Sequence, residues 1–122
     1  MMVEMLIWLA SLMVYNYEDM KEEIDKFNIL SLVMRCSDSS LTPSINMRSA
    51  QCISILSLYD DFFESMVNHN VIELSLNMCL DNSQDIKIQE HASNAIVNFS
   101  LNKKWFQILI NKNVMDLFDA FG

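Results

Sequence analysis

The chain has 122 residues, which suits one domain with a single continuous core. Its hydrophobic content of 52%, together with one glycine and one proline, argues against a sheet-rich fold with many turns. The formal net charge of −8 argues against nucleic acid as a direct ligand, because phosphate contacts need clustered Lys and Arg. This acidity either serves solubility or provides an acidic surface for a basic peptide or domain.

The first predicted element is an apolar helix over residues 5–15. This run is shorter than the roughly 20 residues that span a bilayer. Glu4 precedes it, and the basic start of a signal peptide is missing. We therefore expect a buried helix and no membrane insertion.

Three short segments then repeat one pattern: an apolar residue, three mixed residues, Asn, a β-branched residue, and a Leu four positions past the Asn. The three asparagines, Asn28, Asn70 and Asn113, are 42 and 43 residues apart. A fixed period of this length predicts a helical solenoid. Each Asn is expected to end a helix with a positive φ angle. The segments are residues 24–32, 66–74 and 109–117.

Each repeat is predicted to hold a long helix, a short helix that ends at the recurring Asn, and a last helix that ends in a Ser/Asp loop. Thr42 and Pro43 begin the second repeat as helix cap and first helical residue. The first repeat fits the others only after a shift of one residue. The predicted helices cover residues 5–15, 17–27 and 29–36, then 43–56, 60–68 and 71–80, then 88–99, 103–112 and 114–121.

The long helices of the last two repeats share a packing face of apolar and small residues at helical spacing. Small side chains there let neighbouring helices approach closely. The face comprises Ile88, Ala92, Ala95, Ile96 and Phe99, and, 43 residues earlier, Ile45, Ser49, Cys52, Ile53 and Leu56.

This order of helices, and above all the Ala-rich segment at residues 88–99, resembles the armadillo repeat family. The resemblance covers nearly all of the chain and implies an all-α fold, an α-solenoid with a right-handed superhelix of about three repeats. The repeats would cover about residues 1–41, 42–84 and 85–122 of a single domain. The family usually has Gly where this chain has the recurring Asn, and a HEAT-like repeat is the nearest alternative.

In armadillo-like stacks the long helices line a concave groove, so the resemblance implies a binding site for a protein or an extended peptide. The Trp and Asn pair with which importin-like members hold basic targeting peptides is incomplete here, which argues against that ligand. The implied groove residues are Arg48, Gln51, Ile55, His91, Asn94 and Asn98.

In the first repeat the corresponding positions are apolar. Leu6, Leu9 and Met13 either form an exposed interface patch or, if the register is wrong, belong to the core.

The sequence predicts no catalytic, metal or cofactor site. Its one glycine, Gly122, cannot build a phosphate-binding loop, and it contains no nucleophile elbow and no HExxH motif. Cys36, Cys52 and Cys79 are odd in number and form no CxxC pair. We therefore expect reduced core thiols in a protein of the cytoplasm or nucleus.

These observations predict a non-catalytic scaffold for protein interaction. The repeats show no obvious polar caps, so a covering partner or a homo-oligomer is expected at the ends of the stack. The first alternative is a structural module of a longer helical array or oligomer. A second is a compact helical bundle that binds a partner helix.

Overall fold

The computed structural model describes residues 2–38, 40–81, 85–101, 103 and 106–107. Over these residues the chain forms seven α-helices, one 3-10 turn and no strand, which confirms the predicted all-α class. Asn113 and the predicted helix at residues 114–121 lie outside the described residues, as does most of residues 103–112. The elements are α1 (Met2–Tyr15), α2 (Tyr17–Lys26), α3 (Ile29–Arg35), α4 (Pro43–Leu56), η1 (Asp60–Phe62), α5 (Phe63–Asn68), α6 (Val71–Leu80) and α7 (Ile86–Ser100).

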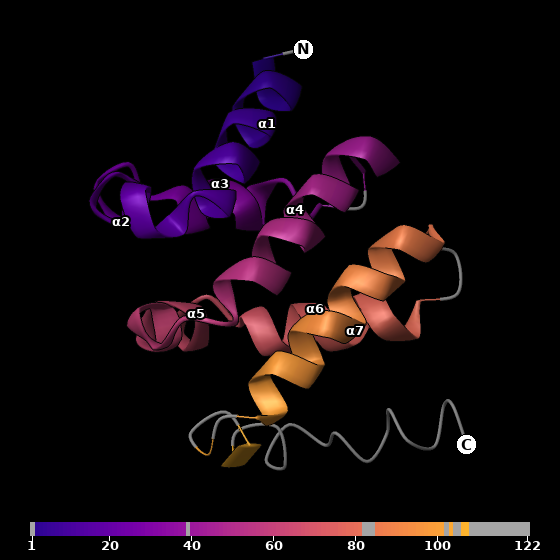
Figure 1. Cartoon of the computed structure of the whole chain (residues 1–122). Coiled ribbons are helices and arrows are strands. Elements are labelled where there is room, and N and C mark those ends of the chain that lie inside the picture. Colours follow the sequence, from indigo (N-terminus) through magenta and orange to yellow (C-terminus); the bar gives the residue numbers. More distant parts are fainter. Residues whose placement is uncertain (1, 39, 82–84, 102, 104–105, 108–122) are drawn as a thin grey trace.

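The three long helices follow one another through the molecule in the order α1, α4, α7 (Figure 1). Helix α4 lies in the middle and packs against both α1 and α7. The shorter helices connect them: α3 packs against α1 and α4, and α6 packs against α7. Each long helix is therefore followed by shorter ones before the next long helix begins.

Local chemistry explains where these helices start and stop. Thr42 accepts a hydrogen bond from the Ile45 amide, and Pro43 takes the first helical position of α4, as predicted. Asn28 and Asn70 have φ angles of 52° and 57°, in the left-handed region. Asn tolerates this region better than most residues, so both asparagines turn the chain into the next helix as the repeat predicted.

The long helices bury their residues in a common register. The buried positions of α1 recur 42 residues later in α4 and a further 43 residues later in α7. The predicted packing face is thus confirmed in α4 and α7, and the one-residue shift places α1 correctly. The equivalent buried residues are Ile7, Ala10, Ser11 and Val14; Ser49, Cys52, Ile53 and Leu56; and Ala92, Ala95, Ile96 and Phe99.

The prediction that the first apolar helix is buried was wrong for most of its surface. Only Ile7, Ala10, Ser11 and Val14 of α1 are buried. Helix α1 packs against α2, α3 and α4 on one side, and no described element covers the rest. An apolar sequence makes a helix suited to burial, but neighbouring helices decide how much of it is covered.

A buried carboxamide joins α4 to the end of α3. Asn46 is 4% exposed, and its Nδ2 donates to the carbonyl oxygens of Cys36, at 2.8 Å, and Asp38, at 2.9 Å. The last carbonyls of a helix have no partner within the helix, so a donor from elsewhere must satisfy them when they are buried.

The same contact recurs one repeat later. Gln89 Nε2 on α7 donates to the carbonyl oxygen of Asp81 at 2.9 Å and makes a longer contact of 3.5 Å with that of Cys79. Each member of this contact lies 43 residues after the equivalent member of the first one: Gln89 after Asn46, Cys79 after Cys36 and Asp81 after Asp38. We call Asn46 and Gln89 the amide clamps.

The three thiols are unpaired and buried, as predicted for Cys36, Cys52 and Cys79. Burial raises the pKa of all three, and that of Cys52 rises to about 12. The thiols therefore stay protonated at neutral pH and act as small core side chains.

An aromatic and ionic contact joins α2 to residues 59–61, at the start of η1. The rings of Tyr17 and Tyr59 stack with centroids 3.6 Å apart. The Tyr17 hydroxyl donates to Asp61 Oδ2 at 2.8 Å, and Lys21 forms an ion pair with the same carboxylate. Asp61 therefore holds two side chains of α2 at once.

We expect Asp61→Asn to lower the melting temperature at pH 7. The hydrogen bonds from Lys21 and Tyr17 hold the pKa of the Asp61 carboxyl below its usual 3.8. A carboxyl whose pKa is lower in the folded state stabilises the fold above its unfolded pKa, and this contribution disappears as the pH falls through the folded value. Thermal unfolding should therefore show a difference between the native chain and the variant that shrinks below pH 3.8.

The matched control for this prediction is Asp25→Asn, which removes an exposed carboxylate from α2. This variant should change the melting temperature little at either pH. A difference for Asp61→Asn that stays constant between pH 7 and the acidic range would contradict the assignment.

Candidate functional site

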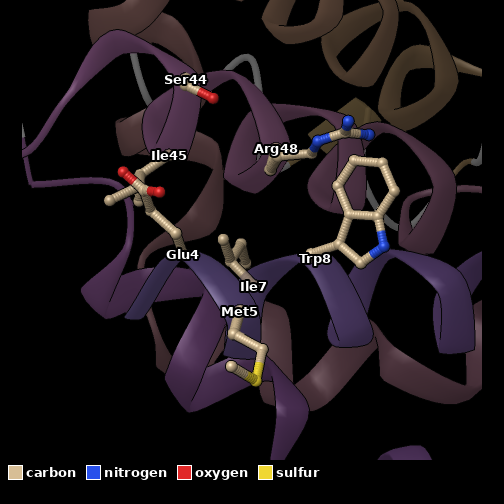
Figure 2. A pocket seen from close by; sticks show the side chains of 7 residues that line it. All are labelled: Glu4, Met5, Ile7, Trp8, Ser44, Ile45 and Arg48. Atoms are coloured by element: carbon tan, nitrogen blue, oxygen red, sulfur yellow. The ribbon is translucent and has the colours of Figure 1, made fainter. Parts of the chain in front are cut away.

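A pocket lies between the N-terminal halves of α1 and α4 (Figure 2). It has a volume of about 350 Å³. Ile7 and Ile45 are the buried apolar residues of its lining, and Figure 2 shows Glu4 and Arg48 on either side of Ile7. It combines apolar surface with charges of both signs. The lining residues are Glu4, Met5, Ile7, Trp8, Ser44, Ile45 and Arg48.

Arg48 and Trp8 form the most specific contact of this pocket. The guanidinium carbon of Arg48 lies 3.9 Å from the centroid of the Trp8 ring (Figure 2). Such a cation–π contact contributes about 0.5–2 kcal/mol, depending on how well it is shielded from water. Trp8 is 47% exposed, so the stacked pair presents an indole and a cation to the surroundings.

Two of the predicted groove amides are engaged within the molecule. Asn98 is half-buried, and its Nδ2 donates to Ser54 O and to Ser57 Oγ, both at 3.0 Å. Gln51 Nε2 donates to the Tyr15 hydroxyl, while Gln51 Oε1 is buried and accepts no hydrogen bond from the described residues. Asn98 thus ties α7 to α4, and Gln51 ties α4 to α1.

The other predicted groove residues on α4 and α7 differ in exposure. Ile55 is half-buried and packs against the core, whereas Asn94 is exposed. His91 is half-buried, and this burial lowers its pKa; Glu90 opposes the shift and Lys87 adds to it. His91 is therefore neutral at pH 7 and adds no positive charge to this surface.

The predicted apolar patch of α1 is largely on the surface. Leu6 is 42% and Leu9 is 49% exposed, while Met13 is half-buried and packs against the core. A register error that would hide these residues in the core is excluded for Leu6 and Leu9. They lie at positions equivalent to Arg48 and Gln51 of α4, 42 residues later.

The exposed apolar surface of α1 extends beyond that patch. Two neighbouring stripes at helical spacing are exposed, and we call them together the α1 apolar face. One stripe includes the predicted Leu6 and Leu9, and the other includes Trp8, next to Arg48. The α1 apolar face comprises Met2, Leu6 and Leu9 on one stripe and Met5, Trp8, Leu12 and Tyr15 on the other.

Sequence reasoning missed Trp8, Met5 and Glu4 as parts of a site. The residue of α1 that is equivalent to Arg48 is Leu6, so the repeat pattern predicts Leu6 and not Trp8 as part of the binding surface. The signal that could have identified Trp8 is its place within an apolar run that has no polar side, since such a helix exposes large side chains wherever a neighbour is absent.

No described helix has the length and apolarity to cross a membrane. Within the described part of the chain, His, Cys, Asp and Glu side chains do not gather in groups of three or more that would suit a metal ion. Comparison with protein-family models, with curated proteins and with solved structures finds no match.

Proposed function

We propose that this chain is a short armadillo-like α-solenoid that acts as a non-catalytic interaction module. It binds a protein or a peptide segment along the face of its long helices. The common register of α1, α4 and α7 supports the repeat architecture, because equivalent residues pack at every step. The two amide clamps support it as well, since each fixes a long helix on the preceding short one.

The observation that carries the binding function is the α1 apolar face. Large apolar side chains that cluster on a surface mark interaction sites, because covering them removes apolar area from water. Leu9 and Trp8 are 49% and 47% exposed, and the face borders the Arg48 pocket directly. A partner seated on this face would reach the pocket without crossing other elements.

Site-specific crosslinking would test this function. A photoreactive amino acid in place of Leu9 should capture a defined partner from the native cell. The same group at Leu58, an equally apolar and 61% exposed position outside the long-helix face, serves as the matched control. Leu9→Glu should then weaken binding of the purified partner, whereas Leu58→Glu should not. Binding that Leu9→Glu leaves unchanged would contradict the proposal.

The α1 apolar face also favours a second candidate function, a structural module that assembles with further helices. In that case the face would be covered by another copy of the chain. Light scattering after size exclusion distinguishes the two, because a monomer has a mass of 14.2 kDa and an assembly has a multiple of it. Leu9→Glu should return an assembly to the monomer mass.

A further inference from the structure

The charged and apolar side chains that line the pocket between α1 and α4 limit which class of partner can bind there. This step rests on the proposed binding function and concerns the same surface. Glu4 and Arg48 stand at opposite ends of the pocket, with Ile7 between them (Figure 2). Neither charged group has an ion-pair partner among the residues that the structure describes.

Arg48 is the cation of this site. It is one of 8 basic residues in a chain with 16 acidic ones, and it has no carboxylate partner among the described residues. Its guanidinium lies over the Trp8 ring, with the guanidinium carbon 3.9 Å from the ring centroid. A guanidinium carries five N–H donors in a rigid planar fork. Such a fork suits a carboxylate, which can accept two hydrogen bonds side by side.

Glu4 supplies the opposite charge at the other end. It lies in the first turn of α1, is exposed, and lines the pocket. Its carboxylate can accept hydrogen bonds from an ammonium or guanidinium group of a partner. A ligand with one uniform charge would be attracted at one end of the pocket and repelled at the other.

The apolar part of the lining selects what lies between the two charges. Ile7 and Ile45 of this lining are buried, and Met5 is exposed. The volume of about 350 Å³ is at the small end of the range for ligand pockets, about 300–1,000 Å³. This space suits one large apolar side chain of a partner rather than an extended cofactor.

We propose that the pocket anchors a partner peptide segment in which a large aliphatic side chain is flanked by an acidic residue on one side and a basic residue on the other. The aliphatic side chain enters the pocket over Ile7 and Ile45. The acidic residue pairs with Arg48 above Trp8, and the basic residue pairs with Glu4. The two ion pairs fix the direction in which the segment lies.

A random peptide library displayed on phage provides the probe. Selection on the purified chain should enrich peptides that combine an acidic, an aliphatic and a basic residue. A synthetic peptide from this group should bind about tenfold more weakly to Arg48→Glu and to Glu4→Lys, because each variant replaces an attraction by a repulsion. A peptide with Lys in place of its acidic residue should bind Arg48→Glu better than it binds the native chain.

Two variants with the same charge changes elsewhere serve as controls. Arg35→Glu and Glu22→Lys alter exposed residues of α3 and α2, away from the pocket, and should leave peptide affinity unchanged. If Arg48→Glu fails to fold, Arg48→Met keeps most of the side-chain contact with Trp8 and still removes the charge. Circular dichroism of each variant verifies that the helices are intact.

The outcomes separate this inference from the function on which it rests. Enriched peptides that share the three residue types and respond to both charge variants would support the inference. Peptides that bind the chain but ignore Arg48→Glu and Glu4→Lys would overturn it and leave the binding function standing. A failure to enrich any peptide, together with no partner captured at Leu9, would overturn both.

Discussion

Leu56→Ala is expected to lower the free energy of unfolding by about 3 kcal/mol, within the range observed when a buried Leu is cut back to Ala. Leu56 is completely buried at the end of α4, the helix that packs against both α1 and α7. Its truncation leaves a cavity in the buried core, whose close packing limits how far the structure can relax. Native domains are stable by only about 5–15 kcal/mol, so this is a large part of the total.

Leu58→Ala is the matched control for this prediction. It makes the same change two positions later, at a side chain that is 61% exposed, and should alter stability by less than about 0.5 kcal/mol. Urea unfolding followed by circular dichroism measures both variants under the same conditions. Equal losses for the two variants would mean that α4 is not the packed centre of the molecule.

Asn46→Ala should have the second largest effect, a loss of about 2–3 kcal/mol. The amide of Asn46 donates to two carbonyl oxygens at the end of α3, and the residue is 4% exposed. Without it, the carbonyl of Cys36 loses a partner at a site where water has little access, which costs more than the net gain from making the bond. The variant should also loosen α3 from α4.

Two further variants make this prediction specific. Asn94→Ala changes the same residue type at an exposed position of α7 and should have little effect. Gln89→Ala removes the second amide clamp and should cost less than Asn46→Ala, because one of its two contacts is longer and its side chain is half-buried. Hydrogen exchange of the last amides of α3 should accelerate in Asn46→Ala only. An Asn46→Ala chain as stable as Asn94→Ala would contradict the clamp.

Several helix starts and turns could be predicted from the sequence because their determinants are local. Asn28 and Asn70 adopt left-handed backbone conformations that Asn tolerates, and Thr42 with Pro43 starts a helix by capping and fixed φ. The packing face of α7 follows from helical spacing alone. Each of these features depends on residues within one or two turns of one another.

The candidate site depended on contacts over longer distances. Asn46 and Gln89 are 43 residues apart, so the repeat places them at equivalent positions. A helical pattern, however, does not distinguish a polar side chain that is buried from one that is solvated. The sequence predicts that Asn98 faces a groove, whereas in the structure its side chain donates to Ser54 O and Ser57 Oγ. A carboxamide is satisfied by whichever backbone lies beside it, and helical periodicity does not identify that neighbour.

Local patterns in the sequence predict the described helices, the left-handed Asn28 and Asn70, the unpaired core thiols and the register of the buried faces. The exposure of most of α1, the contact between Trp8 and Arg48, and the pocket with a charge of each sign between α1 and α4 follow from how the helices pack together. The physical reason is that backbone preferences and helical periodicity act over a few residues. Burial and pairing instead depend on which surfaces the folded chain brings together from about 40 residues away.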